Sequence, residues 1–528
     1  MTRQSKQIFV YDTTLRDGCQ MEGVSLSLEE KLLIAVKLDE LGVHYIEGGY
    51  PFSNPKDTEF FQRAPELKLK HAKLAAFGST RRAGSEARKD KGIRSLVKAE
   101  TPVVTIVAKA WDMHVRKVLR TTLDENLRMV EDTVKFLKRK GREVVLDAEH
   151  FFDGMRENPG YAMKVVRVAA EAGADCVVLC DTNGGTLPEA VEDWTRQACE
   201  SVGVPIGIHC HDDSGVAIAN SLAALRAGAV HVQGTLNGFG ERCGNADLCV
   251  LVPIVDLKTQ WRALGRDKLR KLTEVSRFVY EAANMMFRAN QPFVGTSAFA
   301  HKGGLHVDAM LKDEQSYEHI NPSLVGNERR FLIGELSGRA TVFKKLERQN
   351  ITRDRELMSK ILDEVVRLEN EGYQFEAAEA SFALVARKQA GIYRRLFDVE
   401  GYHVSTIRQS DGTLVTDATV KLRVNGRRVH TASEGDGPVN ALDGALRKAL
   451  GPHYPGLSSV RLTDYMVRVI NPKAATAACV RVVIQSTDGA HTWGTVGVSE
   501  NIIEASWQAL LDSIEYKLFR DEERRRAP

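Results

Sequence analysis

The sequence predicts an α/β protein: a (β/α)8 barrel followed by a helical linker region and a C-terminal α+β domain. Short β-branched runs alternate with amphipathic segments eight times between residues 7 and 260, at even spacing, which favours the closed barrel. An open doubly wound sheet is the alternative, but no GxGxxG motif follows the first strand, as a dinucleotide-binding sheet would require. Beyond residue 403, alternating apolar and polar residues predict further strands.

Eight strands are expected in the barrel, each followed by a helix. The strands are expected at Ile8–Asp12, His44–Gly48, Lys73–Phe77, Val103–Lys109, Glu143–Asp147, Asp175–Asp181, Pro205–His211 and Val230–Thr235. The helices are expected near residues 29–41, 57–63, 84–98, 124–140, 159–172, 188–201, 214–227 and 245–260. At the first helix, Ser27 and Glu30 form a capping-box pattern. Ile34 begins an apolar stripe at positions i, i+4 and i+7, and Gly42 supplies the stop.

The rest of the chain is expected to form two further parts. Residues 1–270 are assigned to the barrel, 271–400 to a helical linker that can reach back over a neighbouring site, and 401–528 to the α+β domain. Helices are expected at 267–289, 354–370, 438–450 and 501–518, and strands at Ala418–Val424, Asp464–Ile470, Cys479–Gln485 and Thr492–Val498. GDGPVNALDGAL at 435–446 is loosely echoed by GVSENIIEASWQAL at 497–510, which indicates a duplicated, sandwich-like β-β-α unit.

The overall composition shows no strong electrostatic preference. The chain has 528 residues, with 73 basic against 70 acidic side chains and a formal net charge of +3. This balance argues against a nucleic acid or a membrane surface as the partner. The eight cysteines form no CxxC pair, and the first residues, MTRQSKQ, do not resemble a signal peptide. No apolar run approaches the ~20 residues of a membrane span. We therefore expect a reduced, cytoplasmic protein.

Ionisable and amide side chains gather after the carboxyl ends of five predicted strands. They are Arg16, Asp17 and Gln20 after the first strand, Glu149 after the fifth, Thr182 after the sixth, His209 and His211 in the seventh, and Asn245 after the eighth. In a (β/α)8 barrel the carboxyl ends of the strands carry the chemistry, whereas the opposite ends carry stability. The sequence therefore predicts a reaction site at this end of the barrel.

The HCHDD segment at the end of the seventh strand indicates a metal site. Residues two apart in a strand point to the same face, so His209 and His211 converge about 7 Å apart at their Cα atoms. Two histidines satisfied by hydrogen bonds are the alternative. Oxygens from Asp17 and Asn245 favour a divalent ion of the Mg, Mn or Zn group, completed by water. The sequence contains no thiolate cluster, which argues against a closed structural zinc site.

The other polar residues at this end each allow a plain structural role and a functional one. Arg16 could form a surface ion pair, or it could bind a substrate carboxylate or an enolate oxygen. Glu149 could be a solvated loop acid, or it could lean into the barrel mouth together with Asp147. Thr182 could stabilise a turn, and its hydroxyl could equally hold a carboxylate. Close backbone approach near the metal explains the glycines of NGFGERCGN, which lacks the GK[ST] ending of a phosphate loop.

Three segments carry a resemblance to a known family. DTTLRDGCQ, the HxHxD of 209–213 and NGFGERCGN resemble signatures of the metal-dependent acyl-CoA condensing enzymes with a DRE-type TIM barrel: the 2-isopropylmalate, homocitrate and citramalate synthases. The resemblance covers nearly the whole chain. Within the family, YIEGGYPFSNPKDTEFF at 45–61 and LDAEHFFDG at 146–154 resemble the citramalate synthase branch, whereas the isopropylmalate branch tends to have an IEAGFP-like segment.

The resemblance implies a role for each candidate residue. It implies that the metal ligands are Asp17, His209, His211 and Asn245, that the substrate contacts are Arg16, Gln20 and Thr182, and that the catalytic residues are Arg16, Glu149, His306 and Tyr317. His306 lies in GGLHVDA, the segment that reaches the active site in this family, and Tyr317 is the tyrosine that accompanies it. One departure is Asp212, where the family usually has Asn; a carboxylate there would add negative charge near the metal.

The resemblance also implies a reaction and partners. It implies Claisen-type condensation of acetyl-CoA with pyruvate and thioester hydrolysis, giving (R)-citramalate for isoleucine synthesis. A branched-chain amino-acid effector at the C-terminal domain and a homodimer are expected as well. The nearest alternative is a 2-isopropylmalate synthase of leucine biosynthesis, which takes a larger 2-oxo acid. A metal-dependent lyase or a non-catalytic 2-oxo acid sensor could also be built on the same barrel.

Overall fold

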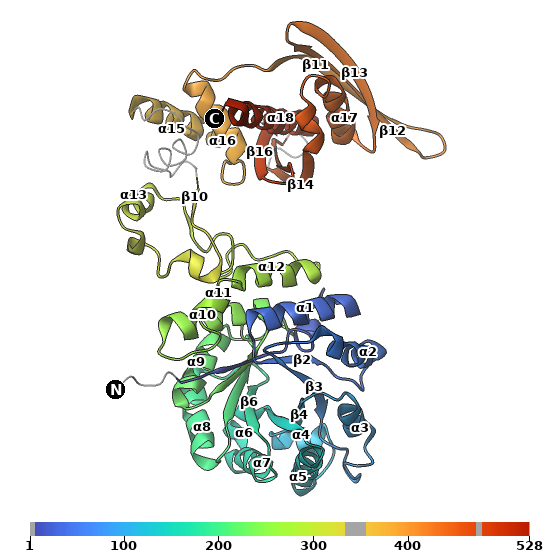
Figure 1. Ribbon diagram of the computed structural model, residues 1–528, viewed down its shortest axis with the longest axis vertical. Helices are drawn as coiled ribbons and strands as arrows, with labels where there is room; N and C mark the ends of the chain where they lie inside the picture. Colours follow the sequence, from blue (N-terminus) through green and yellow to red (C-terminus); the bar gives the residue numbers. More distant parts are fainter. Residues whose placement is uncertain (1–5, 333–354, 471–477, 527–528) are drawn as a thin grey trace. The chain divides into compact units, whose positions relative to one another are not determined.

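The computed structural model describes residues 6–332, 355–470 and 478–526 (Figure 1). The chain divides into two compact units. The first comprises Met1–Phe299 with Ile320–Glu328, and the second Ala300–His319 with Arg329–Pro528. None of the helices in the described part of the chain combines the length and the apolar character needed to cross a bilayer.

Eight parallel strands of the first unit form a closed barrel, in sequence order around the ring, with β8 hydrogen-bonded to β1. The strands are β1 (Phe9–Asp12), β2 (Tyr45–Gly49), β3 (Lys73–Ser79), β4 (Val103–Lys109), β5 (Glu143–Glu149), β6 (Cys176–Asp181), β7 (Ile206–Cys210) and β8 (His231–Gly234). The helices between and after them are α1 (Leu28–Leu41), α2 (Pro55–Arg63), α3 (Lys91–Lys98), α4 (Asp112–Lys117), α5 (Leu123–Arg139), α6 (Phe151–Glu157), α7 (Pro159–Glu171), α8 (Pro188–Ser201), α9 (Ala217–Ala227) and α10 (Leu248–Lys258). The predicted barrel is confirmed, and an open sheet is excluded.

The first helix has the predicted ends. The Ser27 side chain accepts a hydrogen bond from the Glu30 amide, and the Glu30 carboxylate accepts one from the Ser27 amide at 2.6 Å, so the capping box is complete. Gly42 ends the helix in the left-handed conformation, with φ 89°. These ends fix where the chain enters and leaves the outer layer next to β1 and β2.

Two predicted helices are shorter than expected. The helix expected at 84–98 begins only at Lys91, because the Asp90 carboxylate caps it by accepting from the Ile93 amide at 3.1 Å. The helix expected at 267–289 is divided into α11 (Arg266–Leu269) and α12 (Leu272–Ala282). It ends early because Asn284 adopts a left-handed conformation, with φ 52°, just after the last helical residue. The short helices α4 and α6 were not predicted, since each spans at most two turns.

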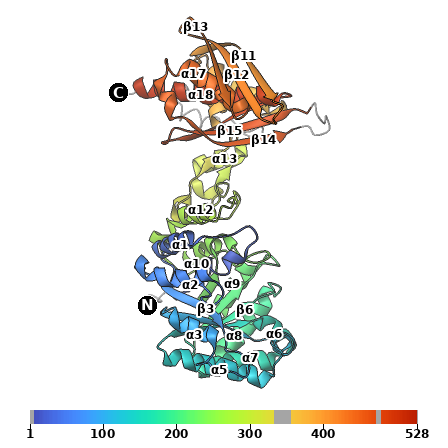
Figure 2. The same ribbon diagram turned by 90° about the vertical axis from the view of Figure 1, so that its right-hand side faces the viewer.

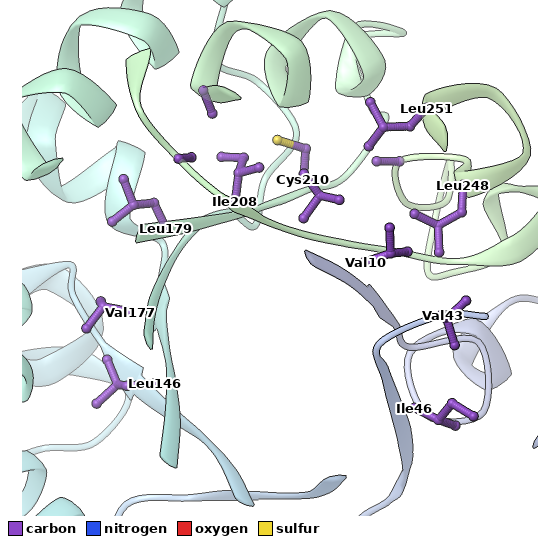
Figure 3. Packing of buried hydrophobic residues seen from close by; sticks show 14 of the residues in the cluster. Val10, Val43, Ile46, Leu146, Val177, Leu179, Ile208, Cys210, Leu248 and Leu251 are labelled. Atoms are coloured by element: carbon purple, nitrogen blue, oxygen red, sulfur yellow. The ribbon is translucent and has the colours of Figure 1, made fainter. Parts of the chain in front are cut away.

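The barrel core has two layers of side chains. Outward-facing residues of the strands pack against the surrounding helices, and Figure 3 shows Val10, Ile208 and Leu248 among the buried side chains of this layer. A smaller cluster fills the inside of the barrel, with Tyr11 and Val178 among its members. Burial of each large apolar side chain contributes about 1.5–3 kcal/mol. This packing holds the strand ends, and the polar groups on them, in fixed positions.

The second unit contains two antiparallel sheets of three strands, and a helix follows each of them (Figure 2). The first repeat consists of β11 (Phe397–Arg408), β12 (Leu414–Val424), β13 (Arg427–Gly435) and α17 (Pro438–Leu450); the second consists of β14 (Arg461–Val469), β15 (Val480–Thr487), β16 (Thr492–Ser499) and α18 (Ile502–Arg526). The predicted α+β domain is confirmed. The duplicated unit is β-β-β-α, so the prediction of β-β-α was wrong.

The strands of the second unit pack on helices. Val420 of β12 lies in one core with Leu446 of α17, and Ile484 of β15 lies in another with Ala509 of α18. Each sheet is therefore covered by its own helix, and the expected sandwich-like arrangement is replaced by sheet-on-helix packing. The unit also contains β9 (Ala300–His301), α13 (Gly304–Lys312), β10 (Arg330–Phe331), α15 (Arg355–Asn370) and α16 (Glu379–Gln389). Of these, only α15 was predicted; residue 354, its expected first residue, lies outside the described residues.

Candidate metal centre and active site

Three buried side chains converge at the carboxyl ends of β1 and β7. The Nε2 atoms of His209 and His211 lie 3.4 Å apart, and Asp17 Oδ2 lies 3.4 Å from His209 Nε2. The ligand atoms of the three residues all lie within 4.8 Å of one another. Two ligands of one ion, each about 2.0–2.2 Å from it, lie roughly 3–3.5 Å apart. The spacing of these atoms therefore fits one divalent ion.

Asn245 completes this cluster from the loop after β8. Its backbone pairs with that of His211, and its Nδ2 donates to Asp17 Oδ2 at 3.1 Å. Its Oδ1 is buried and has no hydrogen-bond partner in the described part of the chain. A buried amide oxygen without a partner is costly, and a water bound to an ion in the cluster would supply one. The residues present thus fit a divalent metal.

The glycines of NGFGERCGN allow the loop to fold tightly around Asn245. A Cβ atom on Gly240, which has φ +151°, would lie 2.4 Å from Asn245 Oδ1. A Cβ atom on Gly244, with φ +93°, would lie 1.9 Å from the Gly238 carbonyl oxygen. Only glycine fits at either position, in agreement with the interpretation of these glycines as a means of close backbone approach.

The charges of the cluster also suit a cation. Although burial opposes ionisation, the Arg16 guanidinium and His209 hold the pKa of Asp17 well below its usual range. Burial and the neighbouring His209 lower the pKa of His211 to about 4, so its imidazole is neutral at pH 7. Burial also disfavours a charged His209, but contact with Asp17 outweighs it and raises the pKa of His209. Asp17 thus stays ionised at a place that favours positive charge.

A chain of hydrogen bonds behind His209 sets its tautomer. Gln233 Nε2 donates to the Asp147 carboxylate at 2.9 Å, which turns the Gln233 carbonyl oxygen toward His209. This Oε1 lies 2.9 Å from His209 Nδ1 and can only accept, so the imidazole proton resides on Nδ1. The lone pair of Nε2 then faces the cluster, as metal ligation requires. Sequence reasoning placed Asp147 near the mouth but missed Gln233.

We expect Gln233→Leu to weaken divalent-ion binding about 10- to 100-fold, because the His209 ring loses the partner that fixes its tautomer. The affinity for Mn²⁺, measured by titration calorimetry on the full chain, checks this. Thr195→Val, which changes a buried polar residue of α8, is the control and should keep the wild-type affinity. Equal Mn²⁺ affinities in the Gln233 variant and the wild type would contradict the role given to this hydrogen bond.

Arg16 is held at the site by a buried carboxylate that the sequence analysis missed. Arg16 Nε lies 2.5 Å from Glu47 Oε1, its Nη1 lies 3.4 Å from Asp17 Oδ2, and its guanidinium lies 3.9 Å from the Phe77 ring centroid. Glu47 is fully buried and also accepts from the Tyr11 hydroxyl at 2.6 Å. An acidic residue in the middle of the predicted strand HYIEG was the available sign, because such strands are otherwise apolar.

A cavity of 400 Å³ lies beside this group, and Arg16, Gln20, Tyr50 and Phe77 are among its lining residues. Its volume lies within the range of small-molecule sites, which begins at roughly 300 Å³. Gln20 is exposed, whereas Arg16 is partly buried. The structure thus brings together two of the three predicted substrate contacts.

Glu149 and Thr182 lie at the ends of β5 and β6. Glu149 forms a close ion pair with Lys109, the residue that pairs with it in register at the end of β4. Sequence reasoning did not single out Lys109. The Thr182 hydroxyl oxygen accepts from the His150 amide at 2.9 Å, so its own hydrogen is available for another acceptor.

Three predicted residues have other surroundings. The Asp212 carboxylate accepts from the amide of Ala217, the first residue of α9, at 2.8 Å, and it is not among the three side chains with metal-ligand spacing. His306 and Tyr317 belong to the second unit, where their rings stack with centroids 4.1 Å apart. The structure therefore brings these two predicted catalytic residues into contact with each other.

Three family models match successive parts of the chain. Residues 7–279 match the HMGL-like family, residues 293–373 the homocitrate synthase post-HMGL domain-like family, and residues 376–518 the LeuA allosteric (dimerisation) domain. Among solved structures, the HMG-CoA lyase of Bacillus subtilis matches 53% of this chain and 95% of its own, at 20% identity and a TM-score of 0.45.

Curated relatives match over nearly the full length. The (R)-citramalate synthase of Aquifex aeolicus is 53% identical over 523 residues, which cover 98% of this chain and 99% of the relative. The (R)-citramalate synthase of Geobacter sulfurreducens is 52% identical, covering 97% and 98%. These matches confirm the resemblance inferred from the sequence motifs. The chain therefore belongs to the HMGL-like family, and these two relatives, which match it over nearly the full length, are (R)-citramalate synthases.

Proposed function

We propose that the protein condenses acetyl-CoA with pyruvate and hydrolyses the thioester, giving (R)-citramalate for isoleucine synthesis. The observation that carries this proposal is the buried cluster of Asp17, His209 and His211 beside Arg16, in a chain 53% identical to an (R)-citramalate synthase. These three residues, with Asn245 directly or through water, would hold a divalent cation of the Mg, Mn or Zn group.

The first task of the site is to hold the 2-oxo acid. A bound divalent ion would take charge off the keto oxygen and make the carbonyl carbon more electrophilic. The Thr182 hydroxyl, whose hydrogen is available, donates to the substrate carboxylate. Arg16, fixed by Glu47, points its guanidinium at the oxygen on which negative charge develops, and Gln20 lines the same cavity.

The second task is proton transfer. A base removes a methyl proton from acetyl-CoA, the resulting enolate carbon attacks the pyruvate carbonyl carbon, and the new alkoxide takes a proton. Water then cleaves the thioester and releases CoA. Glu149, held by Lys109, is the candidate from the barrel. The stacked pair His306 and Tyr317 supplies the candidates from the second unit.

The three parts of the chain divide this work. Residues 1–270 hold the metal and the 2-oxo acid, residues 271–400 supply groups that complete the site, and residues 401–528 regulate it by binding a branched-chain amino acid. The match of residues 376–518 to the LeuA allosteric (dimerisation) domain supports a homodimer. The β14 strand supports it as well, because this edge strand exposes Met466 and Val467 at 47% and 42%.

We expect Met466→Asp/Val467→Asp to shift the protein from dimer to monomer, because the substitution puts charge on both faces of this exposed edge strand. Sedimentation velocity at a fixed protein concentration checks the change in mass. Val118→Asp, which changes an even more exposed apolar residue of the barrel unit, should leave the dimer intact. A dimer that survives the double substitution would remove β14 from the interface.

The reaction is tested by measuring thiol release from acetyl-CoA with pyruvate, 3-methyl-2-oxobutanoate or 2-oxoglutarate as the second substrate. We expect pyruvate to be preferred by at least about tenfold in kcat/KM, and isoleucine to inhibit. Preference for 3-methyl-2-oxobutanoate would instead identify an isopropylmalate synthase. Binding of 2-oxo acids without thiol release from any of the three would identify a sensor.

A further inference from the structure

Arg242, in the loop after β8, is hydrogen-bonded to two other loops at the carboxyl ends of the barrel strands. Its Nε and Nη2 donate to Oδ1 and Oδ2 of Asp213 at 2.7 and 2.9 Å, and Nη2 also donates to the Thr182 carbonyl oxygen at 2.7 Å. Thr182 directly follows β6, and Asp213 lies in the loop after β7. Because β6, β7 and β8 are adjacent in the ring, one guanidinium links the loops that follow three neighbouring strands.

The backbone on both sides of this link is shaped to allow it. Arg242 has φ 57°, a left-handed conformation that residues other than glycine seldom adopt unless their surroundings hold them there. In the loop after β6, a Cβ atom on Gly184 would lie 2.5 Å from Asp213 Oδ2. Glycine at this position therefore lets the Asp213 carboxylate approach that loop, where the fork of Arg242 reaches both Asp213 and Thr182.

Thr182 is held from two sides, and Arg242 provides one of them. The Thr182 hydroxyl oxygen accepts from the His150 amide at 2.9 Å, while the Thr182 carbonyl oxygen accepts from Arg242. The next side chain, Asn183, donates through Nδ2 to the Asp153 carboxylate at 2.9 Å. The bond to His150 leaves the hydroxyl hydrogen available, and the bond to Arg242 fixes the peptide group next to the side chain. Together they set the direction in which the Thr182 hydroxyl can donate.

The charge of Arg242 is already balanced by acidic side chains of the barrel unit. Asp213 accepts from both Nε and Nη2, Nη1 lies 3.6 Å from Glu241 Oε2, and the charge of Asp17 also acts on the guanidinium. A guanidinium whose fork is taken by a carboxylate has few donors left for a substrate anion. We therefore expect Arg242 to hold the loop after β6 and not to hold the substrate itself.

The link between Arg242 and Asp213 is too exposed to contribute much to stability. Their side chains are 43% and 23% exposed, and an ion pair at such a place changes the free energy of unfolding little. The position of a substrate contact is more sensitive, because a displacement of about 1 Å can lower a rate by roughly 10²-fold. Loss of the link should therefore affect the site much more than the fold.

We propose that Arg242 is a positioning residue for the 2-oxo acid: anchored by Asp213, it acts through Thr182, whose hydroxyl donates to the substrate carboxylate. The inference rests on the proposed function, from which it takes the substrate and the Thr182 contact, and it adds two residues to that site. Direct contact of Arg242 with the substrate is the competing explanation, and the test separates the two.

The test is titration calorimetry of pyruvate into the full chain, with saturating Mn²⁺ and without acetyl-CoA. We expect Arg242→Ala to weaken pyruvate binding about tenfold, the effect of losing one hydrogen bond to a charged group. Arg242→Lys should be intermediate, because an ammonium can pair with Asp213 but cannot form the fork. Thr182→Val removes the hydroxyl but keeps the carbonyl, and adding Arg242→Ala to it should cause no further loss. The affinity of each variant for Mn²⁺ alone should stay close to that of the wild type.

Arg226→Ala is the control, because it removes another exposed arginine of the barrel unit, which lies 3.3 Å from Glu192. It should leave pyruvate binding unchanged, and unfolding temperatures show which variants are folded. Wild-type pyruvate affinity in both Arg242 variants, or no pyruvate binding to the wild-type chain, would overturn the proposal. Losses that add up in the double variant would also overturn it and would indicate direct contact. A wild-type chain that binds pyruvate but releases no thiol from acetyl-CoA would refute the proposed reaction, while the binding measurements still decide the role of Arg242.

Discussion

His209→Ala and Asp17→Ala are expected to lower kcat for thiol release by roughly 10³-fold or more. Each removes one of the three convergent ligand atoms that lie within 4.8 Å of one another. A metal that polarises the substrate carbonyl supplies several kcal/mol of transition-state stabilisation, and about 4 kcal/mol corresponds to a factor of 10³. Both variants should also bind Mn²⁺ more weakly than the wild type in calorimetry, which separates loss of the ion from loss of another function.

The control for this experiment is His430→Ala, which removes an exposed histidine of β13. It should retain wild-type activity and Mn²⁺ affinity. Chelator treatment should abolish the activity of the wild type, and added divalent ion should restore it. Full activity of the His209 or Asp17 variant after chelator treatment would remove the metal from the proposed mechanism.

The cluster could be predicted because it depends on rules that operate within single strands. His209 and His211 share a face by the two-residue period of a strand, and the ends of parallel strands meet at one rim of a barrel. Asp17 and Asn245 could be assigned to the same rim for that reason. Gln233 could not be found this way, because its role depends on its register opposite His209 across β7 and β8.

The second unit was less predictable, since its strands are partly exposed. β13 has the sequence RRVHTASEG, in which polar and small residues hide the alternation that reveals a strand. The Asn425-Gly426 turn between β12 and β13, with φ values of 49° and 77°, was the available sign of a hairpin. β11 contains a bulge between Val399 and Gly401, which interrupts its period. Of the first repeat only β12 was therefore predicted, whereas all three strands of the second repeat were.

Glu47→Ala is expected to lower both the stability of the barrel and its activity, because it leaves the Arg16 charge without its nearest partner. Glu47 is fully buried, and the Arg16 side chain is 16% exposed. Removing one partner of such a pair costs about 3–5 kcal/mol in the free energy of unfolding. The guanidinium also loses its fixed position at the site, so kcat/KM for thiol release should fall at least about 100-fold. Urea unfolding and the thiol-release assay measure the two effects.

A second substitution separates these two consequences. In Glu47→Ala/Arg16→Met the guanidinium is removed together with Glu47, although Asp17 loses its neighbour at 3.4 Å, so part of the lost stability should return while activity stays low. Glu47→Gln keeps a side chain that can accept from the Tyr11 hydroxyl, which lies 2.6 Å from the carboxylate, and should be intermediate in stability. If Glu47→Ala is as active as the wild type, Arg16 does not depend on this carboxylate for its position. If the double variant is no more stable than Glu47→Ala, the loss comes from the cavity left by the side chain and not from the unpaired charge.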